Sequence, residues 1–272
     1  MKYDLTAAKS RKLSELLAEK FPHLGKGKIT RLIAGKNVKV GGKRVAEDVV
    51  VSAGETTEVF LPSAFEAEEI RIVYSDENVV IADKPAHVDS VRGLPGLLAP
   101  RFGTLYPAHR LDTNTTGLVV LARGHKTRVE LEKAFKEHTV RKMYVATVIG
   151  CPKKKTGTLC GWLLKDAAQG IVKVCDTPVP GSVEAITEYE VVSSADGLSV
   201  LELYPLTGRT HQLRAQLAHI GCPILGDGKY GNFEENKRRG VKVQQLRAVS
   251  IKFVSLGGIV NYLSGREFKE KE

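Results

Sequence analysis

The sequence predicts an α+β protein in which a small α+β domain precedes a larger domain built on a large mixed or antiparallel sheet. The first 62 residues combine two short helical patterns with short strands. From residue 71, strands and turns alternate with few helices and no regular βαβ rhythm. A chain of 272 residues is long enough for one good core and a smaller second domain. We therefore expect domains at 1–62 and 71–272, joined by an acidic linker at 63–70 that follows Pro62.

Two helices and three short strands are expected in the N-terminal domain. Helical spacing of apolar residues predicts a helix over 10–21, which Pro22 and Gly25 end, and a second helix at about 28–34. The apolar faces comprise Leu13, Leu16, Leu17 and Phe21 in the first helix and Ile29, Leu32 and Ile33 in the second. Short strands are predicted at 38–40, 49–51 and 59–61, separated by glycine turns.

Strands dominate the expected larger domain. Apolar runs predict strands at 72–74, 79–82, 118–121, 144–148, 185–192 and 198–203. Helical spacing predicts helices at about 125–137 and 210–220, the second with Thr210 as its N-cap. The first amides of a helix lack backbone partners, so this strand-to-helix junction is a favourable place for a ligand.

Basic residues are concentrated near the N-terminus. The formal charge is +10, and residues 1–50 hold 12 Lys or Arg against 5 Asp or Glu. Positive charge can simply aid solubility, but a clustered positive field is typical of a module that binds a polyanion. The asymmetry favours a nucleic-acid partner.

Membrane, secreted and metal-binding classes are not expected. No apolar run reaches the ~20 residues that span a bilayer, and the first residues lack the apolar stretch of a signal peptide. The four cysteines form no Cys-x-x-Cys pair. His211 and His219 lie eight positions apart and lack the four-residue spacing of a helical metal pair, so we interpret them as capping or surface residues. We expect a cytoplasmic protein without metal, and a monomer by default.

Two segments match binding patterns by accident. The run from Asp112 to Gly117 resembles the start of an EF-hand loop, but position 12, which requires a bidentate Glu, is Arg123. Residues 226–231 match the dinucleotide-binding pattern G-x-G-x-x-G. A charged stretch follows them and no βαβ unit surrounds them, so we predict a glycine-rich turn beside the sheet.

Three segments carry residue types that suit catalysis. Residues 109–117 read His-Arg-Leu-Asp-Thr-Asn-Thr-Thr-Gly and lead into an apolar strand, which places Asp112 on a loop held by a rigid element. Residues 141–150 form a strand that presents Tyr144 near its start. Residues 205–214 read Pro-Leu-Thr-Gly-Arg-Thr-His-Gln-Leu-Arg and join a strand to a helix.

Each of these residues also has a purely structural explanation. Asp112 could form an Asx turn, Tyr144 could be a half-buried strand aromatic, and Leu213 could be a helix core residue. Arg209 and Arg214 could be solvated. The catalytic interpretation is favoured because all three motifs occur together, in this order and with this local structure.

In these motifs, over about residues 71–253, the chain resembles the RluA-like pseudouridine synthases. The run Thr-Gly-Arg-Thr-His-Gln-Leu-Arg is the most specific part of this resemblance. Residues 9–62 resemble the S-four-type RNA-binding domain, whose motifs are short. The resemblance implies a pseudouridine synthase-like catalytic domain preceded by an RNA-binding domain, and an isomerase that acts on uridine in structured RNA.

The resemblance also implies roles for five residues. Asp112 would be catalytic, as nucleophile or as base, and Arg209 would pair with it and keep it ionised. Tyr144 would stack on the displaced uracil and assist proton transfer, while Leu213 would exclude water. Arg110 would fill the gap that the flipped base leaves in the RNA. The isomerisation gains and loses no atom, so neither a cofactor nor a metal is required.

The implied partner is RNA, most commonly ribosomal RNA of the large subunit, with tRNA as the alternative. The residues expected to contact phosphates are Lys28, Arg31, Lys36, Arg141 and Lys142. Lys153, Lys154 and Lys155 could do so too, or could form a solvated loop.

Two other functions fit the sequence less well, and two segments depart from the family's usual sequence. A non-catalytic RNA-binding or ribosome-assembly protein is disfavoured by the three motifs, and another RNA-modifying enzyme, such as a methyltransferase, by the lack of a convincing nucleotide-cofactor loop. Residues 87–91 and Arg247 differ from the family's usual sequence, which concerns substrate loops more than catalysis.

Overall fold

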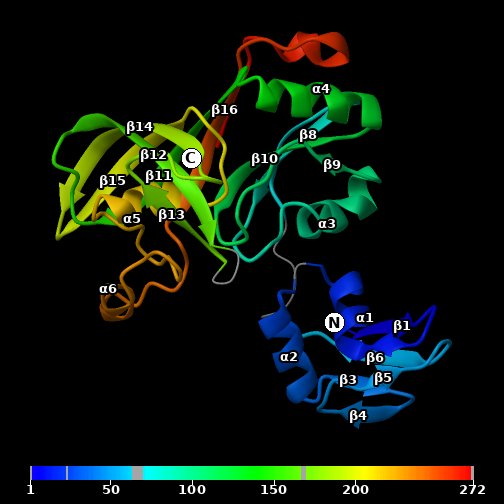
Figure 1. The fold of residues 1–272 in the computed structure, drawn as a ribbon. Helices are drawn as coiled ribbons and strands as arrows, with labels where there is room; N and C mark the ends of the chain where they lie inside the picture. The colour runs from blue at the N-terminus through cyan, green and yellow to red at the C-terminus, as the bar shows by residue number, and fades with distance from the viewer. Residues whose placement is uncertain (1, 23, 63–69, 167–169, 271–272) are drawn as a thin grey trace. The chain divides into compact units, whose positions relative to one another are not determined.

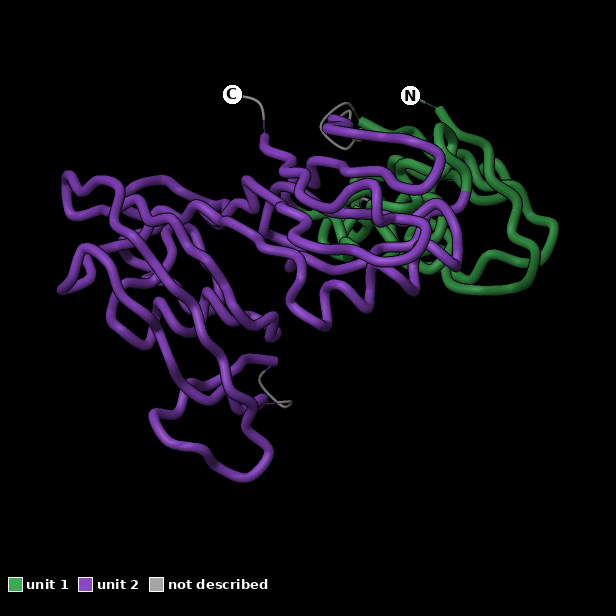
Figure 2. The backbone as a smooth tube through the Cα atoms, turned by 90° about the horizontal axis from the view of Figure 1, so that it is seen from above, with its two compact units in different colours: residues 1–70, 87–103 green, residues 71–86, 104–272 purple. Residues whose placement is uncertain are grey.

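The structure is a computed structural model that describes residues 2–22, 24–62, 70–166 and 170–270. It divides the chain into two compact units, one of residues 1–70 and 87–103 and the other of residues 71–86 and 104–272 (Figure 2). The expected linker at 63–70 lies, apart from Ile70, outside the described residues. We did not predict that 87–103, which contains helix α3 (Gly93–Phe102), would group with the N-terminal unit.

The N-terminal unit packs two helices and its strands around one core. Helices α1 (Leu13–Lys20) and α2 (Lys26–Ala34) bury their predicted apolar faces. The main sheet has the order β1 (Lys2–Thr6), β6 (Thr56–Phe60), β3 (Val38–Val40) and β4 (Lys43–Val45), and β2 (Arg11–Lys12) pairs with β5 (Val50–Val51). The first helix is shorter than the expected 10–21 because its first two basic residues pair as β2.

A large mixed sheet forms the second unit and confirms the predicted fold class (Figure 1). Its order is β13 (Ile171–Cys175), β12 (Thr156–Asp166), β14 (Val183–Ala195), β15 (Leu198–Pro205), β11 (Val140–Ile149), β16 (Leu246–Phe253), β10 (Thr116–Ala122), β8 (Val79–Lys84) and β7 (Ile72–Ser75). Strand β9 (Tyr106–Pro107) pairs with β10, and β17 (Glu267–Lys269) pairs with β16. Strands β10 and β16 run parallel, and the other pairs described are antiparallel.

Three helices accompany this sheet. Helix α4 (His125–Lys136) packs against β10 and the 3₁₀ turn at Gly258–Leu263, over a core that includes Leu118, Leu131 and Phe253. Helix α5 (Gln212–His219) contacts β12 and β13, and α6 (Phe233–Arg238) is short. The helices expected at 125–137 and 210–220 are therefore confirmed. Within the described ranges, no helix is both long enough and apolar enough to cross a membrane.

Candidate active site

Asp112 lies in the loop between β9 and β10, and hydrogen bonds on both sides fix that loop. The amide of Thr115 donates to the carbonyl of Asp112 at 3.0 Å, which closes a tight turn. The ammonium of Lys84, whose side chain is fully buried at the end of β8, donates to the carbonyl of Thr113 at 3.1 Å. The side chain of Gln244 donates to the Thr115 hydroxyl at 2.8 Å. The carboxylate therefore projects from a rigid support.

Gly117 shows why a glycine follows the loop. Its φ of +106° is one that side chains rarely adopt, and a Cβ here would lie 2.1 Å from the carbonyl oxygen of Ala248. This close approach allows β10 to pair in parallel with β16 directly after the loop. The glycine thus determines where Asp112 stands relative to the sheet.

His109 anchors the start of the loop as a neutral side chain. Its Nε2 accepts a hydrogen bond from the amide of Val120 at 3.0 Å, and its ring stacks on Phe135 with centroids 4.4 Å apart. Burial, with a smaller contribution from the charge of Lys142, lowers the pKa of His109 to about 3. It is therefore an anchor and does not carry protons at neutral pH.

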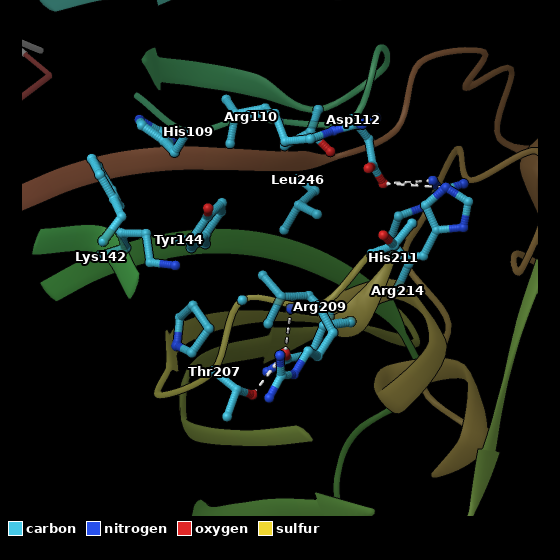
Figure 3. A pocket seen from close by; sticks show the side chains of 18 residues that line it. His109, Arg110, Asp112, Lys142, Tyr144, Thr207, Arg209, His211, Arg214 and Leu246 are labelled. Atoms are coloured by element: carbon cyan, nitrogen blue, oxygen red, sulfur yellow. Dashed lines mark hydrogen bonds and ion pairs between the residues drawn. The ribbon is translucent and has the colours of Figure 1, made fainter. Parts of the chain in front are cut away.

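A pocket of about 290 Å³ opens beside Asp112 (Figure 3). The five residues predicted to act on the substrate all line it: Arg110, Asp112, Tyr144, Arg209 and Leu213. Segments far apart in sequence meet here because they lie on, or directly beside, strands of one sheet. The volume is near the lower limit for ligand pockets, so the pocket suits a single small group.

The partner of Asp112 is Arg214, so the expected pairing with Arg209 is wrong. Nη1 of Arg214 donates to Oδ2 of Asp112 at 2.7 Å, and Nε2 of His211 lies 3.8 Å from the same oxygen (Figure 3). Arg209 lies apart from them and donates from Nε to the carbonyl of Glu184 at 3.1 Å. The backbone at His211, which lies between the two arginines, is left-handed (φ +54°), a conformation in which histidine is enriched.

A second carboxylate holds Arg214. Its Nε and Nη2 donate to Oδ2 and Oδ1 of Asp227 at 2.7 and 2.8 Å, and the Asp227 side chain is fully buried. Burial acts to lower the pKa of Arg214, but Asp227 and Asp112 outweigh it and the net pKa is raised. Burial likewise acts to raise the pKa of Asp227, but Arg214 brings it below its ordinary value. Arg214 is thus a permanent cation between the two acids.

Tyr144 and Lys142 enter the pocket from β11. A β-bulge between Met143 and Tyr144 interrupts the pairing with β16, a feature that changes the direction of a side chain. Tyr144 is only 8% exposed, and burial, followed by the charge of Asp112, raises its pKa. Its phenol therefore stays protonated. Burial lowers the pKa of Lys142.

Helix α5 buries polar side chains that tie it to the neighbouring turn. It begins at Gln212, with His211 in the N-cap position and no side-chain cap, so the prediction of Thr210 as N-cap is wrong. Oε1 of Gln212 accepts hydrogen bonds from the Thr207 hydroxyl at 2.8 Å and from the amide of Arg209 at 3.0 Å. The side chain of Gln212 thus fixes the Thr-Gly turn.

Three residues near the carboxylate were not predicted as site residues: Asp227, Tyr230 and His211, which was interpreted as a capping or surface residue but lines the pocket. The hydroxyl of Tyr230 lies 2.9 Å from Nδ1 of His211, and its ring packs 5.1 Å from the guanidinium carbon of Arg214. Asp227 and Tyr230 belong to the segment at 226–231, which is confirmed as a turn but had been assigned no role in the site. The sequence did hold one indication of their role, because an acid and a tyrosine lie between the glycines of this turn.

The cations predicted to contact RNA occupy different parts of the chain. Lys142 lines the pocket, and Arg141 is exposed beside it on β11. Lys28 and Arg31 belong to α2 in the N-terminal unit, and Lys36 follows the end of that helix. The pocket is also lined by Arg110 and Arg209, so cations outnumber acids on its wall.

Residues 78–219 match the family model described as RNA pseudouridylate synthase. The ribosomal large subunit pseudouridine synthase C of Rickettsia conorii is 30% identical over 262 residues, covering 85% of this chain and 86% of the relative. An uncharacterized RNA pseudouridine synthase of Haemophilus influenzae is 38% identical over 186 residues, covering 65% of this chain and 81% of the relative. The solved structure of human RNA pseudouridylate synthase domain containing 4 matches with a TM-score of 0.59 at 25% identity, over 74% of this chain and 87% of that one.

Proposed function

The chain belongs to the RNA pseudouridylate synthase family, whose members convert uridine to pseudouridine in RNA, and we propose that it does so in large-subunit ribosomal RNA with Asp112 as the catalytic group. The observation that carries the assignment of the site is the convergence of Asp112, Tyr144 and Leu213 on one pocket. We propose that the protein acts as a monomer.

Asp112 is proposed to act on the glycosidic bond as nucleophile or base. The reaction breaks the bond between the ribose and the uracil nitrogen, rotates the base and rejoins it through carbon 5, which loses its proton while the released nitrogen gains one. Oδ2 of Asp112 is occupied by Arg214, and Oδ1 makes no hydrogen bond to any described residue. An oxygen that is free and close to a cation can react without first breaking a protein contact.

Tyr144 and two leucines are proposed to hold the detached uracil. The aromatic ring of Tyr144 offers a flat face, and its hydroxyl, whose pKa burial raises, is a proton donor at neutral pH. Leu213 and Leu246 line the pocket with apolar surface. A base without its glycosidic bond must be shielded from water until carbon 5 reaches the ribose.

The cations of the pocket are proposed to bind the phosphates that flank the uridine. Lys142 and Arg209 line its wall, and Arg110 is exposed two residues before the proposed catalytic group. An exposed arginine at this place suits insertion into the RNA stack when the target base is flipped out, which requires a few kcal/mol of compensation. Arg209 thus keeps a proposed substrate role, although it does not pair with Asp112.

Large-subunit ribosomal RNA is proposed as the substrate because the Rickettsia relative is named a ribosomal large subunit pseudouridine synthase. The alignment with that relative covers most of both chains. Such a substrate implies a cytoplasmic location. We expect the purified protein to form pseudouridine in large-subunit RNA transcripts and not in a tRNA pool, as measured by mapping pseudouridine after the reaction. Conversion confined to tRNA would contradict the proposed substrate while leaving the reaction intact.

The N-terminal unit is proposed to be an S-four-type RNA-binding domain. Replacing Lys28, Arg31 and Lys36 together by Ala is expected to weaken RNA binding. The slope of log Kd against log salt should fall by about 2–3, because each lost phosphate contact removes about 0.7–0.9. Fluorescence anisotropy at four salt concentrations measures this slope.

A charge-matched control separates contact from net charge. Helix α4 also carries three exposed lysines that were not expected to contact phosphates, Lys126, Lys133 and Lys136, and their joint replacement removes the same three charges. We expect the slope to change much less in this control. Equal changes in both variants would show that the N-terminal cations act only through the overall field.

A further inference from the structure

Arg214 divides its hydrogen bonds unequally between two acids. Nε and Nη2 form a bidentate pair with Asp227, and only Nη1 reaches Asp112. Asp227 therefore takes the side of the guanidinium that pairs best with a carboxylate. Asp112 receives one hydrogen bond on Oδ2, while Oδ1 has no partner among the described residues.

The turn at 226–231 is built to hold Asp227 in this position. Oδ1 of Asp227 accepts hydrogen bonds from the amides of Lys229 (2.8 Å) and Tyr230 (3.1 Å). A Cβ at Gly226 would lie 2.1 Å from the carbonyl oxygen of Val243, so this position requires glycine. The carboxylate is thus fixed before it contacts Arg214.

We propose that Asp227 is a positioning residue for the isomerisation: it turns Arg214 so that Asp112 is held by a single hydrogen bond and keeps one oxygen free to react. This proposal rests on the proposed role of Asp112. Without Asp227, the guanidinium is free to rotate and form its bidentate pair with Asp112 instead. Both oxygens of Asp112 would then be engaged, and the full positive charge of Arg214 would act on that carboxylate alone.

The first test replaces Asp227 by Asn. The amide oxygen of Asn can still accept from the two backbone amides of the turn, but its NH₂ group then takes the place of Oδ2 and faces the Nε donor of Arg214. We expect the single-turnover rate to fall by about 10- to 100-fold, as is found when a group that orients a metal-binding side chain is removed. The Kd for RNA is expected to change less than twofold, because Asp227 does not line the pocket.

Asp76→Asn is the matched control for loss of a turn-forming carboxylate. Oδ1 of Asp76 also accepts hydrogen bonds from two backbone amides, those of Asn78 and Val79, both at 2.8 Å, and Asp76 does not line the pocket. Thermal unfolding is expected to shift in both variants, while the single-turnover rate changes only in Asp227→Asn. Equal rate losses in the two variants would overturn the proposal.

A double-mutant cycle provides the decisive measurement. In an Arg214→Met background, Asp227→Asn is expected to cause no further rate loss, because the proposed effect passes through Arg214. A loss as large as in the native background would overturn the proposal. If Arg214→Met is unfolded at the assay temperature, Arg214→Lys serves as the background. In that background, we expect Asp227→Asn to cause a clearly smaller rate loss than it causes in the native protein.

The outcomes also distinguish this proposal from the proposed function. Native protein without isomerase activity, or an active Asp112→Asn variant, would contradict the proposed function. A different result would contradict only the positioning role of Asp227. In that result the native protein is active and Asp112→Asn is inactive, but Asp227→Asn reacts at the native rate.

Discussion

Replacing Asp112 by Asn is expected to abolish pseudouridine formation, with a rate loss of about 10⁴-fold or more. Asn has the same shape and can accept the hydrogen bond from Nη1 of Arg214, but it carries no charge and is a poor nucleophile and base. RNA affinity is expected to stay within about twofold, because phosphate contacts dominate affinity. Chromatography of nucleosides after digestion of the RNA measures the product, and anisotropy measures binding.

Asp76→Asn again provides the control, since it removes a partly buried carboxylate of the same unit outside the pocket. It should keep the native rate. An Asp112→Asn rate within tenfold of the native value would move the chemistry to another residue of the pocket. His211, 3.8 Å from the carboxylate, would then be the next to test.

The parts of the fold that the sequence predicts well are those in which apolar residues repeat with one period. Strand β10 and helix α4 have such patterns, and both were expected within two residues of their bounds. Strand β12 was missed because Gly157 and Gly161 interrupt its pattern. A Cβ at either position would lie within 3 Å of a side chain on the neighbouring strand, so a larger residue there would force that side chain to move.

Helix α3 was missed for a different reason. It contains two glycines and two prolines, which oppose helix formation when considered locally. It forms where its buried residues Leu94 and Leu98 find packing partners, and packing can override propensity. The sequence of these ten residues alone does not show which residues Leu94 and Leu98 pack against.

The predicted site shows a similar division. The motifs correctly indicate which residues meet in the pocket, but two arginines lie in one run, and sequence order does not decide which of them faces Asp112. The three-dimensional arrangement decides it: Arg214 lies in helix α5 and reaches Asp112 and Asp227, whereas Arg209 lies before that helix and donates to the carbonyl of Glu184. Asp227 was missed because its partner, Arg214, lies on a different element, so the pair is visible only in three dimensions.

Replacing Arg214 by Met is expected to cause the second largest effect, a loss of about 3–5 kcal/mol in the free energy of unfolding at pH 7, together with a single-turnover rate that is reduced but still measurable. Met fills much of the same space but leaves the fully buried carboxylate of Asp227 without its cation. Removal of one partner of a buried ion pair is more damaging than removal of both. Urea denaturation measures the loss, and adding Asp227→Asn is expected to restore part of it.

Arg247→Met is the matched control. Arg247 also lies between two carboxylates, those of Asp83 and Glu270, but its side chain is 33% exposed, against 7% for Arg214. Water can solvate the acids that this variant leaves behind, so a loss of about 1 kcal/mol or less is expected. Equal losses in the two variants would contradict the role assigned to burial.

The way in which the stability of Arg214→Met changes with pH also tests whether the variant leaves Asp227 buried without a cation. In the native protein, Arg214 holds the pKa of Asp227 below its unfolded value, so this stabilisation is present above about pH 4 and is lost only as pH falls through the folded pKa. In the variant, burial without a cation should raise the pKa of Asp227 above its unfolded value. The variant then gains stability as pH falls from 7 to 5, because its folded state takes up a proton more readily than its unfolded state does. The difference in unfolding free energy between native protein and variant should therefore be smaller at pH 5 than at pH 7, and a difference that is constant over this range would show that Asp227 finds another partner once Arg214 is removed.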